Sequence, residues 1–483
     1  MEPAFAFPAR FIRVSTARHD FEDVRAELDL PPAAETDRFA PEVLAEAVTI
    51  AAADHEDIED ATEIPFVTID PPGAEDLDQA MFLERVGDGF RVHYAIADLG
   101  VAIPPGGAVD AEARRRGQTL YLPDGRVPLH PPTLSEDALS LLADQVRGAA
   151  LWTIDVAADG ALSNVSVRRA RVRSVAQLDY EGVQNSFDVG SPHPSLEPLA
   201  DLGRLRQKVR VGRGALELAL PEQEVEHDGE DWRVVMRVRT EVDGWNAEVS
   251  LLNGMAAAQL MLDAQVGLLR TLPPADESAE AEFLRTARAL NVPVPDGATP
   301  AEVLVTLDPA LPASIALMTD ATGLLRGAGY EAFDGSPPAQ PDHAGVGGPY
   351  AHVTAPLRRL ADRFGTEVCL AICEKRAVPD WVREALPTLP EIMRTSDQRA
   401  SKVDRTCIDQ AEMWALAGRV GEDFDAVVMH ADREGGDVML REPPAIARCR
   451  GAGLREGAQV SVRLTRLDED RREAEFTYGV VKE

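Results

Sequence analysis

The chain has 483 residues, long enough for two to four domains, and its 45% content of hydrophobic residues is that of a globular protein. It carries 82 Asp and Glu against 49 Lys and Arg, a formal net charge of −33. This balance argues against a polyanion as partner unless positive charge is concentrated locally. Basic residues gather in three places: Arg114–Arg116, Arg168–Arg173 and Arg204–Arg213. For each cluster alone, a solvated surface is the simpler interpretation.

Residues 1–62 are acidic and mostly helical in pattern. Apolar residues at helical spacing predict helices over Asp20–Leu30 and Pro41–Ala53, and Pro31-Pro32 separates them. We therefore expect a small helical N-terminal domain of the helix-turn-helix type.

Residues 63–418 alternate between predicted strands and helices. Phe66–Ile69 has the composition of a buried strand, and glycine-containing turns predict two hairpins, Ala80–Val86 with Phe90–Ala97 and Leu151–Val156 with Ala161–Val172. Trp232–Thr240 reads as a further strand. Four longer helices are predicted: Ser195–Val211, Trp245–Leu272, Pro356–Arg376 and Pro390–Arg419. The pattern is that of an α+β domain with mixed sheets flanked by helices.

The tail, residues 419–483, changes character. Four segments alternate like strands: Phe424–Met429, Asp437–Leu440, Gln459–Leu464 and Ala474–Tyr478. About 60 residues in roughly five strands suit a small barrel of the OB-fold type.

The four cysteines form no Cys-x-x-Cys pair, which predicts neither a zinc site nor a disulfide framework and fits a cytoplasmic protein. The longest apolar helical run, Leu251–Leu269, contains four polar side chains. We expect it to be a buried helix of a globular protein and expect no membrane association.

A turn rich in aspartate connects two of the predicted strands. Asp70 stands at the exit of the strand Phe66–Ile69, and Asp76 and Asp78 follow the turn Pro71-Pro72-Gly73. Two residues apart in extended backbone, Asp76 and Asp78 point the same way. Three converging carboxylates repel one another unless cations lie between them, and Mg²⁺ prefers such oxygen ligands. For any one of these residues, a solvated turn is the alternative.

Several short motifs follow one another in a fixed order: Thr68–Asp78, Ile96–Asp98, Tyr121–Pro123 with Pro128 and Leu134-Ser135, Arg213–Leu216 with Pro221-Glu222, and Tyr350–Arg359. Together they resemble the RNB catalytic domain of the ribonuclease II / ribonuclease R family of exoribonucleases. The tail resembles the S1-type RNA-binding domain that ends these proteins. The resemblance covers about residues 60–480, which divides the chain into 1–62, an RNB catalytic domain at 63–418 and an S1-type OB-fold domain at 419–483.

The resemblance implies hydrolysis of single-stranded RNA from its 3′ end to nucleoside 5′-monophosphates. Asp70, Asp76 and Asp78 would be catalytic metal ligands for Mg²⁺, with Mn²⁺ as a substitute. Arg358 would contact the scissile phosphate, and Tyr121 would stack on a terminal base. Thr354 and Arg359 belong to the same RNA-binding element as Arg358. We expect a monomer.

The sequence departs from the family pattern at three positions. Gln79 replaces the usual fourth aspartate, and its amide oxygen can coordinate a cation only without charge. Leu218 replaces the second base-stacking aromatic residue of the RNA-binding groove, and Ala355 stands where serine is usual. Two N-terminal cold-shock domains cannot fit in about 60 residues.

Three hypotheses therefore stand side by side. The first is an active metal-dependent 3′→5′ exoribonuclease. The second is a catalytically impaired RNA-binding protein of the same fold, because Gln79 breaks the carboxylate set. The third, from composition alone, is an acidic scaffold with no role at nucleic acids.

Overall fold

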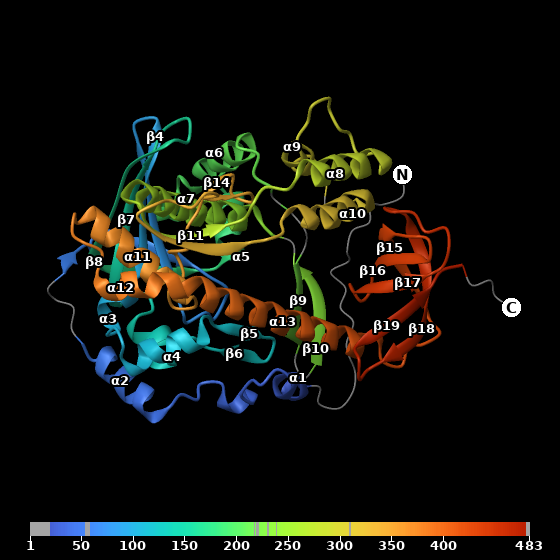
Figure 1. The fold of residues 1–483 in the computed structure, drawn as a ribbon, viewed down its shortest axis with the longest axis horizontal. Coiled ribbons are helices and arrows are strands. Elements are labelled where there is room, and N and C mark those ends of the chain that lie inside the picture. Colours follow the sequence, from blue (N-terminus) through green and yellow to red (C-terminus); the bar gives the residue numbers. More distant parts are fainter. Residues whose placement is uncertain are drawn as a thin grey trace.

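The computed structural model describes residues 20–53, 58–216, 218, 222–228, 231–237, 239–308 and 311–479. Its parts are a body built on a bent sheet, a group of helices on one flank, and a small barrel near the C-terminal end (Figure 1). The long helix α13 (Leu389–Leu416) runs from the body toward the barrel. Helices and sheets are mixed along the chain, so the α+β class expected from the sequence is confirmed.

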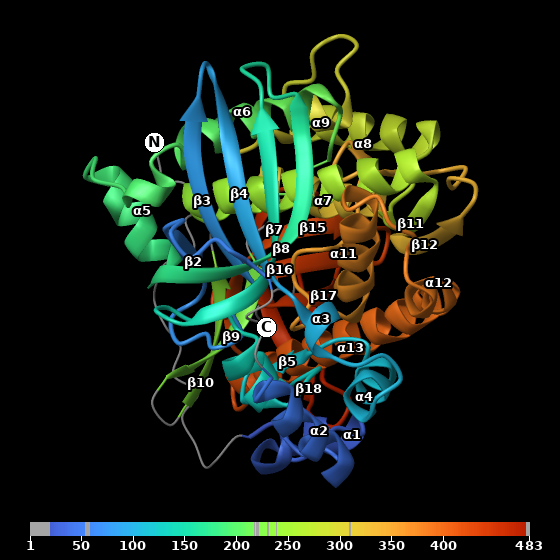
Figure 2. The same cartoon turned by 90° about the vertical axis from the view of Figure 1, so that its left-hand side faces the viewer.

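The body is organised around six strands in the order β1-β8-β2-β3-β4-β7. Their bounds are Glu59–Asp60 for β1, Phe66–Ile69 for β2, Gln79–Val86 for β3, Gly89–Ala97 for β4, Val146–Val156 for β7 and Leu162–Leu178 for β8. Both predicted hairpins, β3–β4 and β7–β8, are confirmed. Figure 2 shows β3, β4, β7 and β8 rising side by side.

Strand β8 closes the sheet on itself, because it pairs antiparallel with β7 along its first part and parallel with β2 at its end. The parallel register sets Ile69 opposite Leu178. On the other side of β2, Val67 pairs with Met81 in the antiparallel register. The end of β2 therefore lies beside the start of β3, and the residues that follow one strand and open the other meet at the same edge.

Helices cover the sheet and enclose the main hydrophobic core. They are α5 (Tyr180–Asp188), α6 (Leu199–Gly212), α7 (Glu241–Ala264) and α11 (Leu360–Cys373). Helices α6 and α7 approach closely at Gly203, where an added Cβ would lie 2.4 Å from the Trp245 ring. Only glycine allows this contact, which fixes α7 over the sheet.

The predicted helix Trp245–Leu272 is wrong at its C-terminal end. Helix α7 stops at Ala264, Gln265 takes the left-handed conformation with φ 57°, and Val266–Thr271 forms strand β11. Strand β11 pairs with β12 (Gly329–Asp334). A short apolar run can be a buried helix or a buried strand, and its periodicity alone does not distinguish them.

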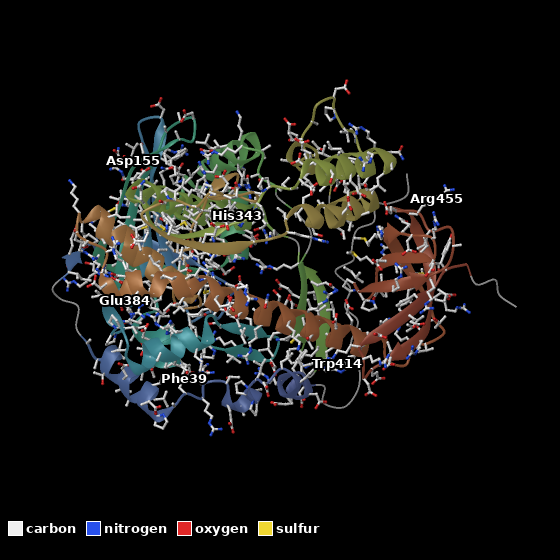
Figure 3. All side chains as sticks on the ribbon, in the orientation of Figure 1. Phe39, Asp155, His343, Glu384, Trp414 and Arg455 are labelled. Atoms are coloured by element: carbon white, nitrogen blue, oxygen red, sulfur yellow. The ribbon has the colours of Figure 1, made fainter. Side chains whose placement is uncertain are left out.

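The N-terminal segment contains α1 (Glu22–Glu27), η1 (Ala33–Glu35) and α2 (Pro41–Ala51). Phe21 and Val24 are buried in one cluster with Leu120, Trp232 and Val403. Side chains of α2, and Phe39 before it (Figure 3), join a different cluster, beneath the sheet. Within the described part of this segment, the buried side chains thus belong to cores shared with the body, and its separation as a domain at residue 62 stays a prediction.

The C-terminal barrel is closed in the order β15-β16-β17-β19-β18, which confirms the expected OB-type barrel. The strands are β15 (Asp423–Ala431), β16 (Gly435–Leu440), β17 (Ile446–Arg450), β18 (Gln459–Asp468) and β19 (Glu473–Thr477). The Phe424 and Phe476 rings meet edge to face in its core, with centroids 5.6 Å apart. Met413 and Leu416 of α13 are buried in the same core. Trp414 of α13 lies beside the barrel (Figure 3), its ring 5.0 Å from that of Phe21.

The remaining elements connect these parts. They are α3 (Leu99–Ala102), α4 (Ala108–Arg116), β5 (Leu120–Leu122), β6 (Gly125–Val127), η2 (Thr133–Ala138), η3 (Pro194–Leu196), β9 (Glu222–Asp228), β10 (Asp231–Arg237), α8 (Glu277–Ala289), α9 (Pro300–Leu304), α10 (Pro312–Ala321), η4 (Thr322–Leu324), β13 (Asp342–His343), β14 (Gly348–Pro349), α12 (Asp380–Ala385) and η5 (Leu386–Thr388). In the described ranges, no helix combines the length and apolar character needed to cross a membrane.

Candidate active site

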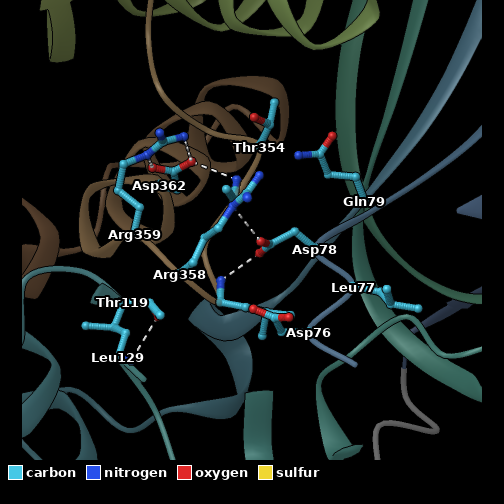
Figure 4. A network of polar contacts seen from close by, with 12 residues as sticks. Asp76, Leu77, Asp78, Gln79, Thr119, Leu129, Thr354, Arg358, Arg359 and Asp362 are labelled. Atoms are coloured by element: carbon cyan, nitrogen blue, oxygen red, sulfur yellow. Dashed lines mark hydrogen bonds and ion pairs between the residues drawn. The ribbon is translucent and has the colours of Figure 1, made fainter. Parts of the chain in front are cut away.

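The aspartate-rich turn is anchored at both ends. The Asp70 backbone N–H donates to the Leu178 carbonyl at 3.0 Å, which fixes the exit of β2. Leu77 is fully buried, its N–H donates to Ser140 Oγ at 2.9 Å, and its carbonyl accepts from the Leu141 N–H at 3.0 Å. Leu77 points into the core, and Asp76 and Asp78 on either side of it point away from that core. Asp78 lies against Arg358 (Figure 4).

Asp78 is the most deeply placed of the three aspartates, with 3% of its surface exposed. Its Oδ1 accepts the Leu357 backbone N–H at 2.7 Å, and its Oδ2 lies 3.3 Å from Arg358 Nε. Burial raises the pKa of Asp78 to about 8, against the opposing effect of Arg358. This carboxylate therefore joins the turn after β2 to the segment that precedes α11.

Asp76 is tied to the hairpin of β5 and β6. The Tyr121 hydroxyl donates to Asp76 Oδ2 at 3.2 Å, and Arg126 Nη1 lies 3.4 Å from Asp76 Oδ1. Arg126 also reaches Glu136, at 2.5 Å. Half of the Tyr121 surface is exposed. The hairpin thus presents an accessible aromatic ring directly beside the second aspartate.

Asp70 is the aspartate that opens onto a cavity. Its carboxylate accepts no hydrogen bond from the described residues, and burial, with repulsion from Asp76, raises its pKa to about 6. The cavity has a volume of about 460 Å³. Polar side chains line it from several elements: Asp70, Gln79, Tyr180, Arg237, Arg239, Asp243, Asn246, Ser250 and Arg358. A cavity lined by both carboxylates and arginines suits a phosphate with cations.

The predicted RNA-binding element Thr354–Arg359 has two differently engaged arginines. The Arg358 side chain is half-exposed and faces Asp78. Arg359 grips Asp362 with two nitrogens, at 2.5 and 2.8 Å, and Asp362 also accepts the Ala355 N–H at 2.8 Å. The described contacts of Arg359 hold the loop that carries Arg358, and its role as an RNA contact stays a prediction.

Two further predicted residues lie on different elements. Thr354 is buried, and its hydroxyl is 3.1 Å from Ser250 Oγ of α7. Leu218 packs against the apolar core of α8, α9 and α10. The structure therefore places Leu218 in a different environment from Tyr121, which lies beside Asp76.

The basic clusters of the sequence are largely paired with acidic residues. Arg115 and Arg116 share Glu112, Arg168 meets Glu59, and Arg169 bridges Asp98 and Glu367. In the third cluster, Arg210 Nε lies 2.8 Å from the buried Glu248. The printed contacts of these arginines therefore hold parts of the fold together.

The aspartates are close enough to repel one another, but they do not form a compact metal cluster. Among the residues that the structure describes, no three His, Cys, Asp or Glu side chains are grouped closely enough to hold a metal ion. Asp76 and Asp78 are instead held by protein donors. The donor chemistry nonetheless fits a hard divalent cation, since all three ligands offer carboxylate oxygens and Asp70 faces the cavity without a hydrogen-bond donor.

Sequence reasoning missed the residues that support this site. Ser140 pins the turn, Arg126 holds Asp76, and the Tyr94 hydroxyl donates to Gln79 Oε1. The sequence did contain a signal for the contact between Tyr94 and Gln79. The tight turn at Gly87–Gly89 fixes the hairpin register, which sets Gln79 opposite Ile96. Tyr94 is then the diagonal neighbour of Gln79 on the same face of the sheet, within reach of a long side chain.

The bent sheet and the five-stranded barrel together are similar to the fold of solved ribonuclease R structures. The Mycoplasma genitalium RNase R structure in complex with ribose methylated single-stranded RNA matches at a TM-score of 0.82 with 18% identity, covering 92% of this chain and 76% of that one. The RNB domain matches residues 58–365, more than half of the chain, and the RNase II-type exonuclease C-terminal S1 domain matches residues 422–479. The chain belongs to the RNB-domain family, which confirms the resemblance seen in the sequence.

Curated relatives share similarity along much of the chain. Exoribonuclease 2 of Escherichia coli is 28% identical over 412 residues, which are 80% of this chain and 62% of the relative. Exosome complex exonuclease RRP44 homolog A of Arabidopsis thaliana is 28% identical over 322 residues, 63% of this chain and 34% of the relative. The chain thus spans between about a third and under two thirds of their lengths. Yeast Ssd1, described as a pseudonuclease, shares the fold at a TM-score of 0.69 with 15% identity, covering 86% of this chain and 54% of that one.

Proposed function

We propose that the chain is a metal-dependent 3′→5′ exoribonuclease that shortens single-stranded RNA to nucleoside 5′-monophosphates. The observation that supports this most directly is that Asp70, Asp76 and Asp78 lie near enough to Arg358 to interact with it electrostatically, and that Asp70 and Arg358 line one cavity with two further arginines. Similarity to Exoribonuclease 2 adds support for the reaction class.

Each of these residues has a separate role at the 3′ end of the RNA. Asp70, Asp76 and Asp78 would hold Mg²⁺, or Mn²⁺ in its place. Bound divalent ions supply an activated water and stabilise the leaving 3′ oxygen. Arg358 is oriented by Asp78, so its outer nitrogens grip the phosphate of the last linkage. Tyr121 stacks on a terminal base, a contact of about 1–3 kcal/mol that is indifferent to sequence.

Capture of RNA falls to the C-terminal S1-type domain, residues 419–483, together with the small helical N-terminal domain. The match of the C-terminal part to the S1 domain supports its role. The division into 1–62, 63–418 and 419–483 assigns hydrolysis to the middle part alone. RNA with a free single-stranded 3′ end is the expected partner.

The test is a time course on a 5′-labelled oligoribonucleotide with Mg²⁺, with Mn²⁺ and with chelator. Stepwise shortening from the 3′ end with mononucleotide release, stopped by the chelator, is expected. RNA binding that survives chelation without any product in either metal would instead establish an impaired RNA-binding protein, the candidate that Gln79 and the likeness to Ssd1 favour. Absence of salt-sensitive RNA binding would reject both.

A further inference from the structure

We propose that Gln79 acts on the substrate rather than on the cations: its amide NH₂ group donates a hydrogen bond to a phosphate oxygen of the RNA, and Tyr94 positions it. This inference rests on the proposed function and assigns a role to the position where the sequence departs from its family. It differs from the expectation that the Gln79 oxygen ligates a metal ion.

The Gln79 amide oxygen already has a partner. Tyr94, on the neighbouring strand β4, is fully buried, and its hydroxyl donates to Gln79 Oε1. The carbonyl oxygen that accepts this hydrogen bond faces Tyr94. The two N–H groups of the same amide are then free to donate to another partner.

The direction of the amide follows from its contact with Tyr94. The fully buried Tyr94 hydroxyl has Gln79 Oε1 as its acceptor, and a buried O–H without an acceptor would be costly. This hydrogen bond therefore holds the carbonyl end of the amide against Tyr94. Close to this pair, Ser250 of α7 lines the same cavity as Gln79, and its Oγ lies 3.1 Å from the Thr354 hydroxyl.

The nitrogen end of the amide lies where a phosphate would bind. Gln79, Arg358 and Asp70 line the same cavity. In Figure 4 the Gln79 nitrogen is on the side of Arg358, whereas its oxygen points away. Arg358 and the Gln79 amide thus offer hydrogen-bond donors from two sides. An anionic oxygen is the group that accepts hydrogen bonds from both.

The experiment separates metal binding from RNA binding in the full-length chain. Mn²⁺ stoichiometry and affinity are measured by electron paramagnetic resonance without RNA, for the wild type, Gln79→Ala, Tyr94→Phe and, as a positive control for ligand loss, Asp78→Asn. The affinity for a fluorescent single-stranded oligoribonucleotide is measured by anisotropy in the presence of chelator. Thermal unfolding confirms that each variant is folded.

Gln79→Ala is expected to leave Mn²⁺ binding unchanged and to weaken RNA binding about tenfold, the loss of one hydrogen bond to a charged group. Tyr94→Phe should weaken RNA binding in the same direction but less, because the amide persists without its fixed orientation. Loss of Mn²⁺ affinity in Gln79→Ala with unchanged RNA affinity would overturn the inference and make Gln79 a ligand. If the wild type hydrolyses no RNA but the binding pattern holds, the proposed function fails while this inference stands.

Discussion

Arg25 and Asp124 form a buried ion pair between the N-terminal helix and the turn of the β5–β6 hairpin. Arg25 Nε and Nη2 reach the two carboxylate oxygens at 2.9 and 2.6 Å, and Arg25 is 1% exposed. Its third nitrogen donates to the Pro31 carbonyl at 3.1 Å. Since the same hairpin carries Tyr121, the N-terminal segment fixes the ring that we assign to the terminal base.

Arg25→Ala should therefore affect both stability and product length. It leaves the Asp124 carboxylate without its partner, and breaking such a buried pair costs about 3–5 kcal/mol of unfolding free energy. With the hairpin loosened, the shortest RNA product should become longer. Denaturant unfolding and gel analysis of end products measure the two effects. The control is Arg38→Ala, whose ion pair with Glu35 is exposed. Equal effects of the two substitutions would contradict the positioning role.

Asp78→Asn should abolish turnover and leave RNA binding nearly intact. The asparagine oxygen can still accept the Leu357 N–H, so the loop is kept, but the charge that serves the cations and Arg358 is lost. A loss of several kcal/mol of charge stabilisation corresponds to at least about a hundredfold in rate. Single-turnover hydrolysis and anisotropy measure the two quantities, with Asp88→Asn at the β3–β4 turn as control. A parallel loss of RNA affinity would count against the assignment.

Two substitutions at Tyr121 distinguish its ring from its hydroxyl. Tyr121→Ala removes the stacking surface, worth about 1–3 kcal/mol, and should lengthen the final product more than it weakens initial binding. Tyr121→Phe keeps the ring and loses only the hydrogen bond to Asp76. It should give end products close to those of the wild type. Identical end products from the alanine variant and the wild type would show that the ring does not stack on the RNA.

Glu412, at the junction between α13 and the β9–β10 hairpin, should make the free energy of unfolding depend on pH. Burial raises the pKa of Glu412 to about 7 from an ordinary value of 4.5, with Asp409 adding to the rise, while Gln223 and Arg405 oppose it. Because the folded state binds the proton more tightly than the unfolded chain, this group costs stability as the pH rises from 4.5 to 7. The cost is fully present above pH 7 and absent below 4.5.

Glu412→Gln should consequently stabilise the chain at pH 8 relative to the wild type, by at most about 3 kcal/mol, and change little at pH 4. The amide oxygen can still accept from Gln223, which donates to Glu412 at 2.7 Å and to the Pro444 carbonyl at 2.5 Å. Thermal unfolding at both pH values measures the difference. Glu384→Gln on the exposed surface of α12 (Figure 3) is the control. A gain that is equal at the two pH values would exclude ionisation of Glu412 as its cause.

The sequence predicted the parts of this molecule that local chemistry determines. Glycine turns predicted both hairpins and alternation predicted the barrel. Asp70, Asp76 and Asp78 indicated where the candidate site lies, and their role as metal ligands stays a prediction. The sequence did not predict the end of α7 at Ala264, because the strand partner of Val266–Thr271 lies more than fifty residues further along the chain. Polar contacts between residues far apart in the sequence were not predicted for the same reason. Neither the contact of Arg126 with Asp76 nor that of Ser140 with Leu77 has a periodicity that the sequence displays.

The last turn of α13 has a practical consequence for work on isolated pieces. Met413 and Leu416 complete the apolar interior of the barrel, although both precede its first strand. A fragment that begins at residue 419 would expose that apolar interior to water at one end, and the exposed surface would promote association between copies of the fragment. A C-terminal fragment meant to be studied alone therefore has to begin upstream of Met413, so that the end of α13 still covers the apolar interior of the barrel.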